Sequence, residues 1–364
     1  MNTKIIHKDL RYIIEYNLPW YKFEGKTLLV SGANGFLPAY MIETLLFLIE
    51  ARRINDIKII ALVRNKQKAQ KRFERYLNCE KLEFVVQDVC DPIALNYDVD
   101  YIIHAASQAS PKYYGIDPVG TLNANILGTN NLLNIAKSKK VEGFLYFSSG
   151  EVYGEIDDNK IPTREEDFGY INPMDVRSCY AESKRMGETM CVSWCHQYNI
   201  PIKIVRPFHT YGPGMRLDDG RVFADFVADI VNCRDIIMKS DGSAKRAFCY
   251  LADATVAFFT VLLKGNIGEA YNVGNSGAEI SILDLAETLV ELYPDLQLKV
   301  IKSDRYENSG YIISKITRNC PDISKIRSLG WEPKIQIREG FKNTINSFLE
   351  QIILEELEHE VKRY

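Results

Sequence analysis

The sequence predicts an α/β fold: a doubly wound parallel sheet of the Rossmann type with a smaller, discontinuous α/β lobe that binds the substrate. Three observations predict it. Short, continuously apolar segments alternate with longer helical patterns between residues 26 and 207, as in a sheet that is buried on both faces. A turn with two glycines, residues 31–38, follows the first apolar segment. After Pro207 the chain changes to loops rich in glycine, proline and charge, which indicates a second substructure.

The predicted elements follow in order along the chain. Residues 1–24 form an extension with a helical pattern that ends near Pro19 and Trp20. Apolar runs predict strands at residues 26–32, 57–63, 81–89, 99–107, 143–149 and 200–207. Apolar periodicity predicts helices at residues 36–52, 121–139, 180–198 and 337–361. The domains that we expect are a Rossmann domain of residues 25–206 and 244–268 and a substrate lobe of residues 207–243 and 269–364.

Composition argues against several classes of protein. A formal net charge of −3 with 26% charged residues gives no reason to expect nucleic acid or an anionic membrane as a partner. No apolar run approaches the roughly 20 residues of a membrane span, and the first twenty residues lack the apolar core of a signal peptide. The eight cysteines form no CxxC pair, so we expect reduced thiols, no metal site, no membrane insertion and a cytoplasmic protein.

The turn after the first strand predicts a dinucleotide cofactor. Gly32 and Gly35 occupy the first two glycine positions of a GxxGxxG turn, where the chain turns tightly and a pyrophosphate approaches the helix N-terminus. Pro38 stands at the third position, which a first helical turn tolerates. The predicted cofactor contacts in this turn and at later strand ends are Gly32, Asn34, Gly35, Phe36, Leu37, Val89, Ala105, Ala106, Ser107 and Pro207.

The second strand ends in Arg64, at the position where an acidic residue binds the adenosine ribose of NAD. Arginine there accommodates the 2′-phosphate of NADP, and Lys66 and Lys68 add positive charge nearby. We therefore favour NADP over NAD as a tightly bound cofactor, with a solvated basic loop as the alternative explanation. Asp88, after the third strand, is placed either to accept from the adenine amino group or to cap a turn.

Three further residues predict an oxidation site. Tyr180 and Lys184 lie four residues apart on a predicted helix and therefore share one face. A nearby ammonium lowers the pKa of a phenol, and the tyrosine can then remove a hydroxyl proton while hydride leaves for a nicotinamide. Ser149, at the end of the fifth strand, can hydrogen-bond the same substrate oxygen.

Several longer segments resemble one known family. Residues 104–129 are similar to its substrate flap and following helix, residues 180–191 to its catalytic helix and residues 211–227 to its nucleotide-binding segment. Residues 243–253 and 320–333 resemble two further segments of its small lobe. The chain thus resembles the extended short-chain dehydrogenase/reductases, the NAD-dependent epimerase/dehydratases, and within them the UDP-glucuronate decarboxylases.

The resemblance implies a nucleotide-diphosphate sugar as substrate and assigns roles to single residues. Tyr180, Lys184 and Ser149 carry over as the group that oxidises the sugar at C4, and Glu151 matches the family glutamate beside C5. Arg246 matches the arginine that meets the diphosphate or the sugar from the small lobe. The remaining implied substrate contacts are Ser110, Asn125, His209, Arg216, Arg221 and Val222.

Three positions depart from the family pattern and bear on the reaction. Gly150 stands where the 4,6-dehydratases carry an aspartate that expels the C6 hydroxyl, and where the decarboxylases carry a serine. Dehydration needs such a general acid, whereas decarboxylation does not, because a 4-ketone accepts the electrons that the departing carboxylate leaves. His209 replaces an asparagine near the expected diphosphate. Asp225 replaces an asparagine at the nucleotide, where a carboxylate needs a cationic partner such as Arg221.

The sequence leaves four functions open. The first is C4 oxidation followed by chemistry at or near C5, with UDP-glucuronate decarboxylation as the best example, and the second is 4-epimerisation or 4-keto reduction. The third is 4,6-dehydration, which Gly150 argues against. The fourth is a non-catalytic, dinucleotide-sensing scaffold, which the retained Tyr180 and Lys184 argue against. The resemblance also implies a homodimer, joined through the helices at residues 121–139 and 180–198.

Overall fold

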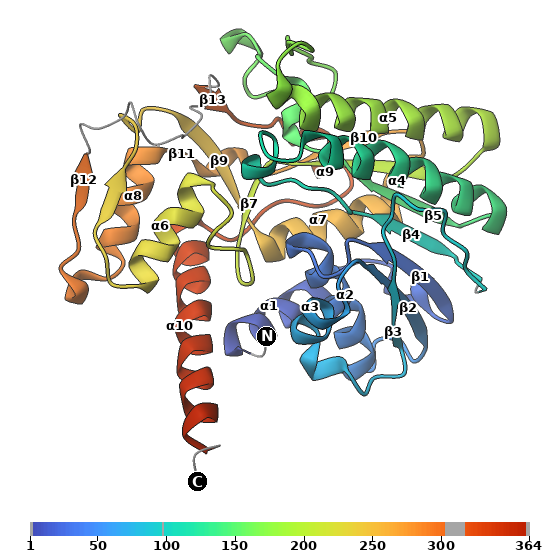
Figure 1. Cartoon of the computed structure of the whole chain (residues 1–364), viewed down its shortest axis with the longest axis horizontal. Helices are drawn as coiled ribbons and strands as arrows, with labels where there is room; N and C mark the ends of the chain where they lie inside the picture. The colour runs from blue at the N-terminus through green and yellow to red at the C-terminus, as the bar shows by residue number, and fades with distance from the viewer. Residues whose placement is uncertain (1–2, 97, 303–316, 362–364) are drawn as a thin grey trace.

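A seven-stranded parallel sheet forms the centre of the molecule. Its strands are β1 (Lys26–Ser31), β2 (Ile57–Val63), β3 (Leu82–Val86), β4 (Tyr101–His104), β5 (Gly143–Phe147), β6 (Ile202–Pro207) and β10 (Ala270–Val273). The computed structural model describes residues 3–96, 98–302 and 317–361. The strand order is β3-β2-β1-β4-β5-β6-β10, and all neighbouring strands are parallel (Figure 1). The predicted doubly wound parallel sheet is confirmed.

Helices cover both faces of this sheet. They are α2 (Phe36–Glu50), α3 (Lys66–Arg72) and α7 (Leu251–Lys264) on one side and α4 (Pro118–Lys139) and α5 (Cys179–Tyr198) on the other (Figure 1). The side chains of β1 alternate accordingly: Leu28 and Val30 join the buried cluster that includes α2 and α7, whereas Leu29 joins the cluster with α4 and α5. This alternation is typical of a strand buried on both faces.

A smaller sheet lies beside the first. It consists of β7 (His209–Tyr211), β9 (Lys245–Tyr250), β11 (Glu279–Ser281) and β13 (Arg318–Asn319), and the other three strands all pair with β9. The remaining elements of this part are β8 (Ile236–Met238), β12 (Val300–Lys302), α6 (Val222–Val231), α8 (Ile282–Glu291), α9 (Ser324–Arg327) and α10 (Ile337–Val361). In the part of the chain that the structure describes, no helix is long and apolar enough to cross a membrane.

The division into two domains stays a prediction, but two strands pair with the sheet of the other predicted domain. β9, which falls within residues 244–268, pairs with strands of the small sheet. β10, which falls within residues 269–364, is instead the edge strand of the large sheet and pairs with β6. The reason is that β6, α7 and β10 pack together as a parallel crossover unit. Residues 303–316 of the predicted lobe lie outside the described residues.

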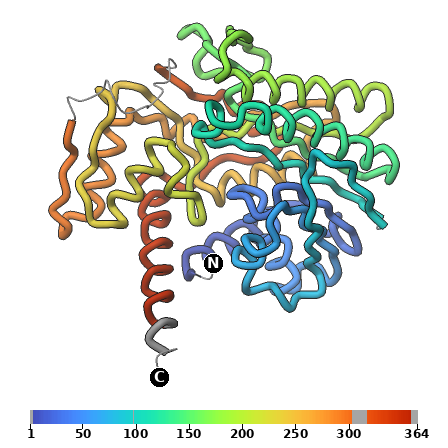
Figure 2. The backbone as a smooth tube through the Cα atoms, in the orientation of Figure 1, coloured from blue at the N-terminus to red at the C-terminus, as the bar shows by residue number. Residues whose placement is uncertain are grey.

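The N-terminal segment folds onto the junction of the two sheets. α1 (Lys4–Ile14) begins after Thr3, whose side chain accepts a hydrogen bond from the Ile6 N–H, and it packs against α2, α7 and α10. Figure 2 shows this segment between α10 and α2. The helix predicted in the extension is present, and the buried residues on its apolar side are Ile6, Leu10, Ile13 and Ile14.

Gly187 on α5 provides a test of the packing on the sheet. Replacing glycine by alanine normally stabilises an exposed helix interior by about 1 kcal/mol. Here a Cβ would overlap the Tyr146 side chain of β5. We expect Gly187→Ala to lower the free energy of unfolding by about 1–3 kcal/mol, measured by chemical denaturation. Gly277→Ala is the control, because its Cβ would meet only the Asn275 side chain at 3.4 Å. A stabilised Gly187→Ala variant would contradict this packing.

Candidate active site

The glycine turn has the geometry of a pyrophosphate cradle. Gly32 follows β1 with a φ of +65°, which favours glycine. A Cβ on Gly32 would lie 2.8 Å from the Ala106 Cα, and one on Gly35 would lie 2.9 Å from the Gly32 carbonyl oxygen. Gly35 is the N-cap of α2, and Pro38 lies in the first helical turn. The first amides of α2 have no acceptor within the helix, so the residues present fit a bound dinucleotide.

A hydrogen-bonded junction behind this turn joins β1 to β4. The Ser31 hydroxyl accepts from the backbone N–H groups of Ala105 and Ala106 at 3.2 Å each, and it lies 2.8 Å from Nδ1 of His104. Burial, and then the positive charge of Lys184, lowers the pKa of His104 to about 3. The neutral ring can therefore accept a hydrogen bond from the Ser31 hydroxyl through Nδ1. Sequence reasoning missed Ser31, although a polar residue at the end of an apolar strand was a signal.

Arg64 and Asp88 lie together at the ends of β2 and β3. Nη1 of Arg64 is 3.8 Å from the Asp88 carboxylate, and the arginine side chain is 64% exposed. The same carboxylate accepts from the Cys90 N–H at 2.9 Å, so the turn-capping role considered for Asp88 is present. Both residues line one cleft with the glycine turn. An exposed guanidinium is thus available to an anion, but a carboxylate already lies beside it.

The three predicted oxidation residues converge on this cleft. Tyr180 and Lys184 lie in the first two turns of α5, and Ser149 follows β5. The Lys184 ammonium donates to the Phe147 carbonyl oxygen at 2.6 Å, and it lies 5.9 Å from the centre of the Tyr180 ring. The Tyr180 ring stacks on Tyr114, with 5.2 Å between the ring centres. These contacts fix both side chains before any ligand binds.

Burial controls the protonation of this group. Desolvation lowers the pKa of Lys184 to about 7, because the ammonium lies away from water. Desolvation also raises the pKa of Tyr180, and a hydrogen bond with the Ser149 side chain acts in the opposite direction. The lowered phenol pKa that the sequence predicted is therefore absent from this structure, since desolvation outweighs every neighbouring group.

The short helix η4 (Gly150–Tyr153) follows Ser149 and carries two residues that bear on the reaction. Glu151 is exposed and lines the cleft. A Cβ on Gly150 would lie 3.2 Å from ring atoms of Phe208, which is tighter than an ordinary contact. Arg185 on α5 donates to the backbone of η4 at 2.6 Å. The catalytic helix and the Glu151 turn are therefore held together.

The segment after β4 is bound to the segment after β7. Arg221 donates to the Ala109 carbonyl oxygen at 3.1 Å, and Ser110 donates to the Asp219 carbonyl oxygen at 2.6 Å. The ion pairs of these segments are Arg221–Asp219 at 3.0 Å, Arg216–Asp218 at 2.7 Å and Lys112–Asp218 at 3.1 Å. A phosphate that binds Arg216 or Arg221 must therefore compete with a carboxylate.

His209 and Arg246 lie on the small-sheet side of the cleft. His209 is in β7, and its ring packs edge-on against Phe248 with 5.8 Å between the ring centres. Nδ1 of His209 is buried, and nothing in the described chain hydrogen-bonds it. Burial, and then the positive charges of Arg246 and Arg221, lowers the pKa of His209. His209 is therefore a neutral imidazole in the wall of the cleft, and one of its nitrogens has no hydrogen-bond partner among the described residues.

The structure brings all but one of the predicted site residues into a single cleft. The exception is Asn125, which is fully buried and donates to Oγ of Ser183 at 2.9 Å. The partner suggested for Asp225 was wrong. This carboxylate pairs with Lys239 at 2.9 Å, because Arg221 is already held by Asp219.

Among the cleft residues that were not predicted, two take part in contacts of the site. Tyr114 forms the stacking partner of Tyr180, and Lys112 joins the flap to Asp218. Both belong to the flap sequence SPKYYG, in which consecutive aromatic residues beside a lysine were the available signal.

Known proteins are similar to this chain over most of its length. The model of the NAD dependent epimerase/dehydratase family matches residues 28–274. UDP-glucuronic acid decarboxylase 3 of Arabidopsis thaliana is 34% identical over 316 residues, which are 86% of this chain and 86% of that protein.

Two solved structures show the same fold. UDP-glucose 4-epimerase of Thermotoga maritima, with UDP-glucose, is 23% identical with a TM-score of 0.75 over 90% of this chain and 99% of that chain. UDP-glucuronic acid 4-epimerase of Bacillus cereus, in complex with NAD, is 23% identical with a TM-score of 0.72 over 89% of this chain and 99% of that chain.

The buried Lys184 makes unfolding depend on pH. Its pKa is about 7 in the folded chain, against an ordinary value of 10.5. Between these values the unfolded chain binds more protons, so this group makes the free energy of unfolding rise with pH. We expect wild type to gain about 2–3 kcal/mol over Lys184→Met between pH 7 and 9, measured by chemical denaturation without cofactor. Lys184→Met removes the titrating group itself, so a difference that stays constant between pH 7 and 9 would contradict the buried ammonium.

Proposed function

Because the chain belongs to the NAD-dependent epimerase/dehydratase family, we propose that it is a nucleotide-sugar decarboxylase that oxidises its substrate at C4 and releases carbon dioxide from C5. One observation carries the proposal: Ser149, Tyr180 and Lys184 share a cleft with the glycine turn, and Gly150 offers no acid for dehydration. UDP-glucuronic acid is the proposed substrate, because a relative of 34% identity is named for its decarboxylation.

The cofactor site is the glycine turn. Gly32, Gly35 and the first amides of α2 would hold the pyrophosphate of a nicotinamide dinucleotide, since a side chain at either glycine would crowd the backbone. When bound, the nicotinamide supplies an acceptor for the C4 hydride and later returns that hydride.

The residues of this chain manage the proton at C4. We assign Tyr180 to remove the proton of the C4 hydroxyl and Ser149 to hydrogen-bond the same oxygen. Burial raises the pKa of Tyr180 while the Ser149 hydrogen bond lowers it, so deprotonation needs additional positive charge in the cleft. Lys184, fixed by the Phe147 carbonyl oxygen, is the proposed source when it is protonated.

The carbon–carbon bond breaks without a leaving-group acid. After oxidation, the 4-ketone lies next to C5, and the electron pair of the C5–C6 bond moves toward the ketone oxygen as carbon dioxide departs. A proton then adds to C5, and the hydride returns to C4, so the overall reaction needs no external oxidant or reductant. Glu151, exposed in the cleft beside Ser149, is the proposed group for the proton at C5.

The first test is incubation with UDP-glucuronic acid and no added reductant. We expect release of carbon dioxide and a product lighter by that mass, detected by mass spectrometry. Tyr180→Phe should reduce turnover by about 100-fold or more, because proton transfer by a positioned side chain contributes that much. A product of unchanged mass would instead indicate 4-epimerisation, and it would contradict decarboxylation.

A second candidate, 4-keto reduction, draws support from Arg64. An exposed arginine at the end of β2 suits the 2′-phosphate of a dissociable NADPH, whereas Asp88 beside it weakens that preference. Turnover of a 4-ketosugar only with added NADPH would favour the reductase.

Arg64→Ala tests the cofactor directly. If Arg64 binds the 2′-phosphate, we expect the variant to bind NADP about tenfold more weakly and NAD unchanged, measured by titration of cofactor fluorescence. The exposed Arg53→Ala, outside the cleft, should change neither affinity. A wild type that prefers NAD, with the same preference in Arg64→Ala, would contradict NADP.

The proposed assembly is a homodimer through α4 and α5. Exposed apolar side chains on these two helices support it: Val119, Leu127, Met186, Val192 and Tyr198. Such a pair of helices meeting its own copy would form a four-helix contact. The enzyme is proposed to act in the cytoplasm.

A further inference from the structure

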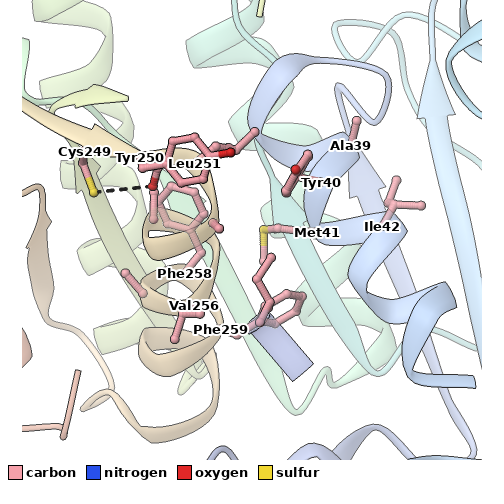
Figure 3. Packing of buried hydrophobic residues seen from close by; sticks show 14 of the residues in the cluster. Ala39, Tyr40, Met41, Ile42, Cys249, Tyr250, Leu251, Val256, Phe258 and Phe259 are labelled. Carbon is pink, nitrogen blue, oxygen red and sulfur yellow. Dashed lines mark hydrogen bonds between the residues drawn. The ribbon is translucent and has the colours of Figure 1, made fainter. Parts of the chain in front are cut away.

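Asp9, at the centre of α1, binds two elements that carry opposite sides of the cleft. Its Oδ2 accepts from the Tyr40 hydroxyl at 2.8 Å and from the Tyr250 hydroxyl at 2.7 Å. The Asp9 side chain is buried, as are both tyrosines. Figure 3 shows Tyr40 and Tyr250 in the apolar layer between α2 and the start of α7. One carboxylate oxygen therefore joins three segments that lie far apart in the sequence.

Each tyrosine belongs to an element that also carries a predicted ligand contact. Tyr40 is in α2, little more than one turn after Gly35, the N-cap at the cofactor turn. Tyr250 is the last residue of β9, and Arg246 lies four residues before it in the same strand. Through these two hydroxyls Asp9 contacts the element that holds the cofactor turn and the element that holds a substrate arginine.

A second pair fixes α1 in the same place. The Tyr12 hydroxyl donates to Oδ1 of Asp253 at 2.6 Å, and Oδ2 of Asp253 accepts from the N–H groups of Lys334 and Ile335 at 2.9 and 2.8 Å. α1 also binds α10 through the hydrogen bond from the Lys4 N–H to Glu350 and the contact between Lys8 and Glu339. The helix is thus bound to α2, α7, β9 and α10 at once.

The apolar side of α1 is buried against the protein, so Asp9 is not the only attachment of this helix. A buried carboxylate costs desolvation energy, so it adds little net stability. The carboxylate instead fixes the orientation of the two tyrosines, since both hydroxyls must point at one oxygen. The cost and the geometry together indicate a role in positioning.

We propose that Asp9 is a positioning residue, which through Tyr40 and Tyr250 fixes the cofactor turn relative to the strand that carries Arg246. This inference goes beyond the proposed reaction. It requires only that one side of the cleft binds a dinucleotide and the other a nucleotide diphosphate.

Burial and the two tyrosine hydrogen bonds act in opposite directions on the protonation of Asp9. Burial raises its pKa to about 7, against the hydrogen bonds from Tyr250 and Tyr40 and the charge of Lys8, while the charge of Asp253 raises it further. The folded chain therefore binds more protons than the unfolded chain between pH 4 and 7. The stability linked to protonated Asp9 is present at low pH and is lost as the pH rises through 7, because the buried carboxylate then carries a charge. The two tyrosine hydrogen bonds oppose this loss, since they favour the ionised form.

Four variants separate the two hydrogen bonds of Asp9, the one from Tyr40 (the Tyr40 arm) and the one from Tyr250. We expect Tyr40→Phe to weaken NAD binding about fivefold and leave UDP binding unchanged, and Tyr250→Phe to do the reverse. Asp9→Ala should weaken both, whereas Asp9→Asn should restore both, because the amide oxygen still accepts. NAD and UDP are titrated separately by calorimetry into the full chain, so the result does not depend on which reaction is catalysed.

The control is Tyr293→Phe, which removes a hydroxyl bonded to Asn346 at 2.7 Å outside the cleft. It should change neither affinity. A lower unfolding temperature with unchanged NAD and UDP affinities in all Asp9 and tyrosine variants would show that α1 only stabilises the fold, and it would overturn the proposal. If wild type binds NAD but not UDP, the proposed substrate fails while the Tyr40 arm is still tested.

Discussion

Parallel pairing brings the ends of β1, β4, β5 and β6 to one edge of the sheet, and the cleft depends on this constraint. Gly32, Ala105 and Pro207 lie at or just after three of these strand ends, Ser149 follows the fourth, and all line the cleft. Ser31, at the end of β1, joins this strand to the loop after β4 by accepting hydrogen bonds from two backbone amides of that loop. Strand pairing thus brings the cofactor turn and Ser149 to one edge, and the packing of α5, with the contacts to Phe147 and Tyr114, adds Tyr180 and Lys184.

The sequence predicted what depends on local pattern. The strands of the large sheet up to β6 have continuous apolar runs, and Tyr180 and Lys184 share a helix face because of their spacing. It did not predict what depends on distant partners. Asp225 pairs with Lys239, because Arg221 already forms an ion pair with Asp219. The assignment of β9 and β10 to the two sheets also rests on long-range pairing that no short pattern records.

The charges of the cleft are arranged so that few are free before a ligand binds. Burial keeps His209 in the cleft and His104 behind the glycine turn neutral, and the pKa of Lys184 falls to about 7 for the same reason. Arg216 and Arg221 are held by the aspartates that flank them. A diphosphate would exchange with carboxylates for these guanidinium groups, so binding replaces existing ion pairs instead of creating all of them anew.

The contact between Gly150 and Phe208 bears on how such enzymes diverge. Any side chain at position 150 starts with a carbon 3.2 Å from the Phe208 ring, so the ring must shift first. Phe208 in turn packs with Val152 and Tyr153 in a small buried cluster. An acidic side chain at position 150 would therefore need a small shift of Phe208 within this cluster. The packing behind the turn, and not only the residue at position 150, therefore bears on whether an acid fits there.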